Sequence, residues 1–132
     1  MYQSVTNNFN PTKLTKTDGE VLFEFKPYMP TLAFPLEVGK KWTGEYSGYT
    51  ADNGDKWSGR PECEATAFEK VKVVAGEFDA FRIDCVDHWR ALLVFSGEKT
   101  STRWYAPKVG TVVKVVHDDA KWNYQLTSYK LD

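Results

Sequence analysis

The sequence has few of the residues that usually carry chemistry. Its 132 residues include two cysteines and two histidines, and these form no cluster with the spacing of a metal site. It also lacks a glycine-rich phosphate loop and a nucleophile with a matched base. We therefore predict no catalytic residues, no metal and no cofactor, with an enzyme that uses an unrecognised pocket site as the alternative.

The sequence also has no excess of positive or negative charge. The 17 basic and 18 acidic residues almost cancel, which leaves a formal net charge of −1. A balanced chain has no long-range field that attracts a phosphate backbone or an anionic membrane. The composition therefore argues against nucleic acid as a partner.

Long hydrophobic runs are also missing. The longest apolar stretches, such as residues 91–95, are far too short to span a bilayer. The first three residues lack the basic n-region and apolar h-region of a signal peptide. We expect a soluble chain without a transmembrane segment, and we expect any export signal to lie outside this chain.

What the chain does have is a pattern of β-strands, clearest in residues 62–86. In residues 62–73 apolar and charged side chains alternate with a period of two, which is typical of a strand with one buried face. Phe81 and Ile83 belong to the same alternation in the second strand. A three-residue loop around Gly76 would join the two into an antiparallel hairpin with both apolar sets on one side.

The register of this hairpin predicts the state of the two cysteines. A loop of residues 75–77 places Cys85 opposite Ala67. Cys63 then lies four residues further along, roughly 13 Å away at about 3.3 Å per residue. Because a disulfide needs Cα atoms within about 7 Å of each other, we expect two reduced cysteines buried in the core. A bulge near Phe68 would alter the register and permit a bridge.

Further strand signals follow one another along the chain. Strands are predicted at residues 20–25, 41–50, 88–95, 100–105, 111–116 and 122–131, with a turn at 96–99 and a reversal within 51–61. No stretch has convincing helical periodicity. The predicted fold class is therefore all-β: one domain over residues 1–132, in which an antiparallel meander forms a sandwich or a curved, partly open barrel.

Residues 26–35 are predicted to be an extended, ordered connector. Pro27, Pro30 and Pro35 exclude regular hydrogen-bonded structure there. Four large apolar side chains of this segment are expected to be tucked against the main body. They are Tyr28, Met29, Leu32 and Phe34.

Three segments carry a resemblance to a known family. They are Phe34–Trp42 (FPLEVGKKW), Val73–Ile83 (VVAGEFDAFRI) and Trp104–Gly110 (WYAPKVG), the last followed by Val113 and Lys114. With these segments the chain resembles an uncharacterised bacterial domain-of-unknown-function family of exported proteins, which more often has Pro where this chain has Val74. The resemblance spans roughly Phe34 to the C-terminus. It implies a β-rich domain that is periplasmic or otherwise extracytoplasmic, with no catalytic residues to carry over.

Three polar groupings are better explained by structure than by chemistry. His88 follows Asp87, but adjacent strand residues point to opposite faces and cannot act as a base with its orienting carboxylate. His117 lies at a strand-to-turn junction, where acidic neighbours are ordinary. Residues 52–55 resemble the start of a calcium loop whose later ligands are absent. We expect both histidines to be dispensable for any activity.

An aromatic recognition surface is the strongest candidate for a binding site. Its residues are Tyr46, Tyr49, Trp57, Arg60 and Asp55. Exposed rings can anchor a ligand, and charged neighbours can supply hydrogen bonds. Residues 49–61 form the longest polar excursion between strong strands, where recognition residues can vary without disturbing the core. The competing interpretation is that these rings are buried singly in the core.

The sequence thus favours a non-enzymatic, extracytoplasmic β domain of the bacterial envelope. Its expected ligand is a protein, a glycan or an apolar molecule. One alternative is a hydrolase or isomerase with a deep pocket of convergent ionisable groups. The other is a lipocalin-like carrier of a small molecule, with a continuous apolar cavity.

Overall fold

The computed structural model describes residues 2–5, 11–15, 21–26, 30–50, 56–91, 95–118 and 123–126. In this part of the chain the regular elements are all β-strands. They are β1 (Tyr2–Val5), β2 (Pro11–Thr15), β3 (Val21–Lys26), β4 (Lys41–Thr43), β5 (Tyr46–Thr50), β6 (Lys56–Val73), β7 (Gly76–Ala91), β8 (Phe95–Ala106), β9 (Thr111–His117) and β10 (Tyr124–Gln125).

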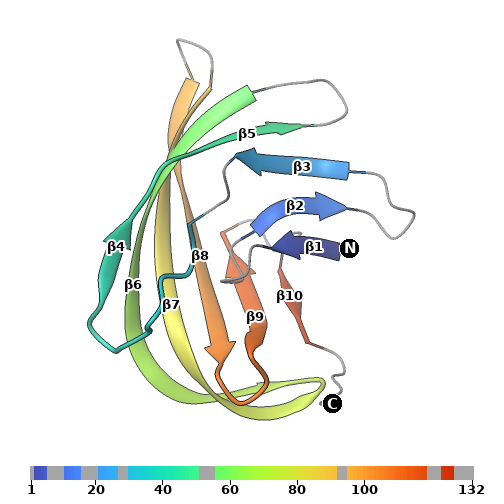
Figure 1. Ribbon diagram of the computed structural model, residues 1–132, viewed down its shortest axis with the longest axis vertical. Coiled ribbons are helices and arrows are strands. Elements are labelled where there is room, and N and C mark those ends of the chain that lie inside the picture. The colour runs from blue at the N-terminus through green and yellow to red at the C-terminus, as the bar shows by residue number, and fades with distance from the viewer. Residues whose placement is uncertain are drawn as a thin grey trace. The chain divides into compact units, whose positions relative to one another are not determined.

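These strands form one sheet (Figure 1). Their order is β1-β2-β3-β5-β6-β7-β8-β9-β10, and β4 pairs with β6 beside this path. Pairs such as β1 with β2, β5 with β6 and β8 with β9 are antiparallel. The predicted all-β antiparallel fold is therefore confirmed, with most strands next to their neighbours in sequence.

Several strand boundaries differ from the sequence prediction. β1 and β2 were not expected, and the predicted strand 41–50 is interrupted at Gly44, where a Cβ would lie 2.5 Å from the Pro30 ring. The predicted reversal within 51–61 is confirmed, because β5 pairs with β6 in antiparallel orientation, although residues 56–61 already belong to β6. The predicted turn at 96–99 is wrong, since these residues belong to β8. The polar residues of these two segments occupy exposed strand positions. Their composition is similar to that of a turn. The segments 51–55 and 92–94 lie outside the described residues.

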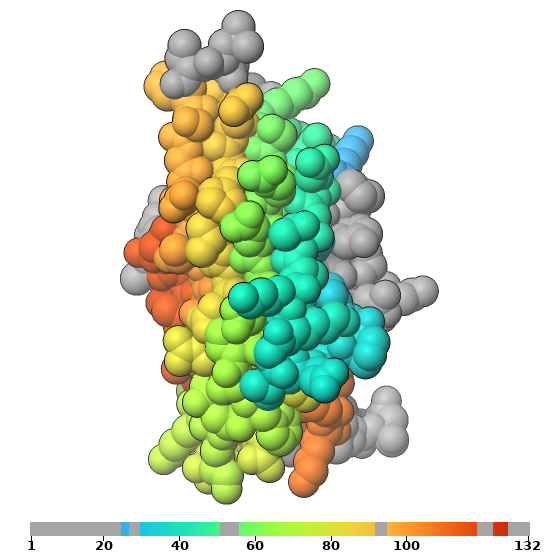
Figure 2. Space-filling model, turned by 90° about the vertical axis from the view of Figure 1, so that its left-hand side faces the viewer, coloured from blue at the N-terminus to red at the C-terminus, as the bar shows by residue number. Residues whose placement is uncertain are grey.

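The chain divides into two compact units, which are considered separately. Unit 1 comprises Met1–Phe34, Trp42–Glu62 and Asp87–Glu98, and unit 2 comprises Pro35–Lys41, Cys63–Val86 and Lys99–Asp132. Within unit 1, Figure 2 shows β5, β6, β7 and β8 side by side on one face.

The core of unit 1 is built from aromatic rings set over glycines. Tyr46 lies directly opposite Gly59, and Gly48 lies directly opposite Trp57. A Cβ at either glycine would collide with the facing ring. The edge of Phe25 packs against both rings, with centroids 5.6 Å from Tyr46 and 6.2 Å from Trp57. The two glycines thus make room for large rings on the buried face of a pleated sheet.

The connector is irregular where the structure describes it. Of the predicted connector 26–35, Lys26 still belongs to β3, whereas residues 30–35 contain no strand, as predicted, and Leu32 is 3% exposed. The expectation for Phe34 is wrong, because a bend at Phe34 and Pro35 leaves its ring 39% exposed. Tyr28 and Met29 lie outside the described residues.

Unit 2 has an apolar cluster between β6, β7, β8 and β9. Its buried members are Val71, Val73, Phe78, Ala80, Ala106 and Val113. The end of the connector is hydrogen-bonded to β6, since Gly39 N donates to Ala65 O at 2.8 Å and Ala65 N donates to Lys40 O at 2.9 Å. Gly39 has a φ of 95°, which only glycine adopts readily.

The predicted hairpin exists, but its register is different. Cys63 and Cys85 form a disulfide with Cα atoms 4.1 Å apart, so the expectation of two free thiols is wrong. The connection is a two-residue turn at residues 74–75, after which Gly76 has a φ of 139°. This tighter turn brings Cys85 towards Cys63 instead of Ala67.

The ladder between the hairpin strands is also irregular. Buried positions in β7 change parity between Ala80 and Ile83, which is typical of a β-bulge. Phe81 lies at this change and is half-buried, packed against the exposed ring of Phe68 with centroids 4.8 Å apart. The alternation in β6, from Cys63 to Val73, is confirmed.

Asp84 of β7 is a carboxylate held by three donors. It accepts hydrogen bonds from Thr102 Oγ1 at 2.6 Å, Thr66 Oγ1 at 2.7 Å and Arg82 Nε at 3.2 Å. Burial raises the pKa of the Asp84 carboxyl, but these hydrogen bonds and the Arg82 charge lower it by more, so its pKa lies below the ordinary value. Because folding lowers the pKa of Asp84, its ionised carboxylate stabilises the folded protein at any pH above its unfolded pKa of about 3.9. This stabilisation is lost as the pH falls through the pKa of Asp84 in the folded protein.

We therefore expect Asp84→Asn to lower the melting temperature at pH 7 and to lose this effect below about pH 4. Thermal unfolding of both proteins between pH 7 and pH 2 measures the difference. Asp79→Asn, at an exposed position of the same strand, is the control and should leave the curve unchanged. A deficit for Asp84→Asn that stays constant at all pH values contradicts this account.

Candidate functional site

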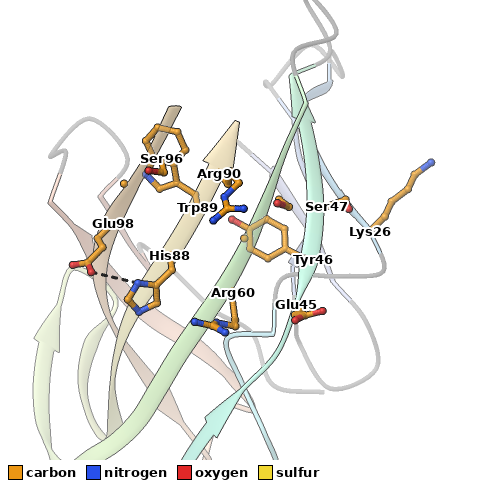
Figure 3. Close-up of a pocket in the computed structure, with 13 residues that line it drawn as sticks. Lys26, Glu45, Tyr46, Ser47, Arg60, His88, Trp89, Arg90, Ser96 and Glu98 are labelled. Atoms are coloured by element: carbon orange, nitrogen blue, oxygen red, sulfur yellow. Dashed lines mark ion pairs between the residues drawn. The ribbon is translucent and has the colours of Figure 1, made fainter. Parts of the chain in front are cut away.

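A hollow of about 820 Å³ lies in unit 1 (Figure 3). It is lined by residues of β3, β5, β6, β7 and β8 and by Glu45, which precedes β5. The lining residues are Lys26, Glu45, Tyr46, Ser47, Ser58, Gly59, Arg60, His88, Trp89, Arg90, Ser96, Gly97 and Glu98. Most of its polar side chains come from alternate strand positions, which share one face of the sheet.

Three cationic side chains (Lys26, Arg60 and Arg90) and two carboxylates (Glu45 and Glu98) line the hollow. Arg60 of β6 and Arg90 of β7 are exposed, and neither has an ion-pair partner among the described residues. The Lys26 side chain points away from the other labelled lining residues in Figure 3, and its Nζ lies 5.7 Å from the centroid of the Tyr49 ring. Three serine hydroxyls line the same space, from Ser47, Ser58 and Ser96. The hollow therefore offers charged donors and neutral hydroxyls together.

The imidazole of His88 lies between two carboxylates. Its Nε2 is 3.2 Å from Glu62 Oε2, and its Nδ1 is 3.3 Å from Glu98 Oε1, the contact dashed in Figure 3. The carboxylates contact different nitrogens of the ring, so the three groups do not converge on one point. Consistently, no cluster of metal-ligating residues occurs within the described ranges.

Asp87 points away from His88, as strand geometry predicts. Asp87 is 8% exposed and its Oδ2 accepts a short hydrogen bond from the hydroxyl of Tyr46. Trp57 Nε1 in turn donates to the Tyr46 hydroxyl at 3.2 Å. Burial raises the pKa of Tyr46 far above its usual value, and the negative charge of Asp87 raises it further. The phenol therefore stays protonated and acts as a fixed donor.

The predicted recognition residues are divided by the fold. Tyr46 and Arg60 both line the hollow, although Tyr46 is only 4% exposed. Tyr49 and Trp57 are half-buried and are not lining residues. Asp55 lies outside the described residues. The expected aromatic surface is thus replaced by a polar hollow whose rings are largely held in the core.

The sequence reasoning missed the contribution of β7 and β8 to this hollow. Its missed lining residues there are His88, Trp89, Arg90, Ser96, Gly97 and Glu98. The available signal was a polar face repeated in three strands, at residues 58–60, 88–90 and 96–98. Because a solvated strand face has the same period-two pattern, the sequence alone does not distinguish a site from ordinary surface.

His117 and Asp118 take part in turn structure. His117 N donates to Asn123 Oδ1 at 2.6 Å, and Thr100 N donates to Asp118 Oδ2 at 3.1 Å. These contacts agree with the expected role of polar residues at a strand end. The calcium-loop resemblance at residues 52–55 lies outside the described residues.

Comparison with known proteins gives no assignment, since no family model, curated protein or solved structure matches the chain. In the described ranges there is no helix with the length and hydropathy needed to cross a membrane. The site is therefore interpreted from its own chemistry.

Proposed function

We propose that this protein is a non-enzymatic binding domain whose hollow in unit 1 binds an acidic glycan. The observation that carries the proposal is the presence of two arginines, Arg60 and Arg90, that have no acidic partner among the described residues but line one hollow. A guanidinium presents paired donors that match a carboxylate in a bidentate arrangement. A uronic acid residue supplies such a carboxylate.

The neutral groups of the hollow suit the remainder of a sugar. Ser47, Ser58 and Ser96 offer hydroxyls that donate and accept hydrogen bonds, as sugar hydroxyls do. Trp89 is also a lining residue, but its ring packs over Gly97 and strand alternation puts it on the face opposite His88 and Arg90, so the proposed contacts with the sugar are the polar ones. An apolar ligand fits this lining poorly, because it would desolvate charged groups without replacing their hydrogen bonds.

The same groups do not suit catalysis. The Tyr46 hydroxyl is fixed on Asp87, and His88 is engaged by Glu62 and Glu98. A general base needs a free position close to the proton that it removes. Binding without turnover is therefore the function that these contacts favour.

An extracytoplasmic location in the bacterial envelope is part of this proposal. The Cys63–Cys85 disulfide supports it, because such bonds persist mainly in oxidising compartments. The turn segments that resemble a family of exported bacterial proteins point in the same direction.

Calorimetric titration tests the proposed ligand. We expect a trimer of galacturonic acid to bind and a neutral galactose trimer to bind at least tenfold more weakly, since loss of one charge-assisted contact of about 1.5 kcal/mol changes affinity about tenfold. Arg60→Gln and Arg90→Gln should each weaken binding of the acidic trimer by roughly tenfold.

Lys70→Gln is the matched control for these variants. Lys70 is an exposed cation in unit 2, and its loss should leave the affinity unchanged. Equal binding of the acidic and neutral trimers, or equal losses in all three variants, would show that Arg60 and Arg90 do not form a site. Binding of neither trimer, together with capture of a protein partner through Arg60 and Arg90, would replace the glycan by a protein.

A further inference from the structure

Arg103 is a buried arginine in unit 2 that has no acidic partner among the described residues. It lies in β8 and is 4% exposed. A guanidinium keeps its positive charge in proteins, and buried charges are normally paired. Within the described part of the chain no carboxylate forms an ion pair with Arg103, and its Nε is buried without a hydrogen-bond partner. Its Nη2 donates to Ser101 Oγ at a long 3.4 Å.

The described neighbours of Arg103 are apolar side chains and hydroxyl groups. Arg103 faces Val115 of β9, which in turn faces Tyr124 of β10. Val115 is almost fully buried, and Tyr105, two residues along β8, is buried as well. Burial lowers the pKa of the Arg103 guanidinium, and the nearby Tyr124 phenol acts in the opposite direction. Among the described residues, the neighbours of the Arg103 guanidinium are apolar or neutral, and none of them carries a compensating negative charge.

These surroundings define which anion would fit. One cation balances one negative charge, whereas a phosphate monoester carries about −1.5 to −2 at neutral pH. The planar fork of a guanidinium matches the two coplanar oxygens of a carboxylate. The neighbouring valine and tyrosine side chains favour an apolar body next to that carboxylate.

We propose that unit 2 contains a binding site for a monocarboxylate with an apolar body, in which Arg103 binds the carboxylate beside Ser101 and Tyr124. This site is separate from the hollow in unit 1 and does not depend on the proposed glycan. The ligand neutralises the buried guanidinium and satisfies its Nε, so binding removes an electrostatic cost that the ligand-free protein carries.

Titration of the whole protein with octanoate tests the site directly. The Nε–H resonance of Arg103, followed by NMR and assigned by its absence in an Arg103→Lys variant, is expected to shift and saturate. Acetate and inorganic phosphate, which lack the apolar body, and octanol, which lacks the charge, should each bind at least tenfold more weakly. An unchanged resonance at 1 mM octanoate overturns the proposal, and so does an equal response to phosphate or acetate, which would indicate a site for any small anion.

Two variants separate binding from folding. Arg103→Met removes an uncompensated buried charge, so the ligand-free protein should melt roughly 3–6 °C higher, and octanoate should no longer stabilise it. Arg103→Lys keeps the charge but loses the fork, and it should bind octanoate at least tenfold more weakly. Arg82→Met, which removes an arginine that already contacts Asp84 in the same unit, should leave octanoate binding unchanged.

A large fall in the melting temperature of Arg103→Met would show that the fold itself requires the guanidinium, which contradicts the proposal. Failure of this site leaves the unit 1 proposal intact, because the two tests use different probes and different variants.

Discussion

Removal of the Cys63–Cys85 disulfide is expected to lower the free energy of unfolding by about 3 kcal/mol. The bond joins two long strands across 22 residues of sequence. In the chain-entropy account, a cross-link of this span restricts the unfolded chain and so stabilises the folded one, with about 3 kcal/mol for a loop near this size. This is a large fraction of the 5–15 kcal/mol that is typical of a folded protein.

Denaturant unfolding of the protein and of a Cys63→Ala/Cys85→Ala variant measures this difference. The untreated protein should also react with no thiol reagent after unfolding, and its mass should be two protons below the reduced value. Reductant should destabilise the protein but leave the double variant unaffected, which is the internal control. Two reactive thiols in freshly purified, exported protein would contradict the bond.

Substitution of Trp57 by Ala is expected to destabilise the protein by about 3 kcal/mol, the lower end of the range for a large aromatic residue. The ring fills the space above Gly48, packs against Phe25, and donates a hydrogen bond to the Tyr46 hydroxyl at 3.2 Å. Its loss opens a cavity and removes a partner of the buried Tyr46–Asp87 hydrogen bond.

Phe95→Ala is the matched control, because this ring is 57% exposed and its loss should cost within about 0.5 kcal/mol. Trp57→Phe keeps a ring over Gly48 and should recover most of the stability. A fall in ligand affinity with unchanged stability in Trp57→Ala would return Trp57 to the role of an exposed recognition residue.

His88 shows how far local geometry can be predicted. The period of a strand is two, so Asp87 and His88 had to point to opposite faces, and they do. What His88 contacts was not predictable from its neighbours in sequence. Glu62 and Glu98 reach it from β6 and β8, and their approach depends on how those strands are paired.

The sequence by itself determined the fold class and the buried face of β6, but not that of β7, whose buried positions change parity between Ala80 and Ile83. The alternation from Cys63 to Val73 is a local signal, because successive side chains of a strand point to opposite faces whatever the partner strand is. The β-branched residues of β9 are a local signal as well, since such residues are enriched in strands. The irregular structure of the connector was also predictable from a local signal, because a proline cannot donate a backbone hydrogen bond to a neighbouring strand.

Only the tertiary structure decided the pairing of the cysteines and the composition of the hollow. The turn is shorter than predicted and the ladder is irregular, so different residues of β6 and β7 face each other. This change of register brings together two cysteines that the predicted register keeps apart, and they form a disulfide. Arg60, Arg90 and Arg103 look alike in sequence, as charged residues within strands. Their different positions, two in an open hollow and one in an apolar interior, depend on cross-strand neighbours that no local pattern specifies.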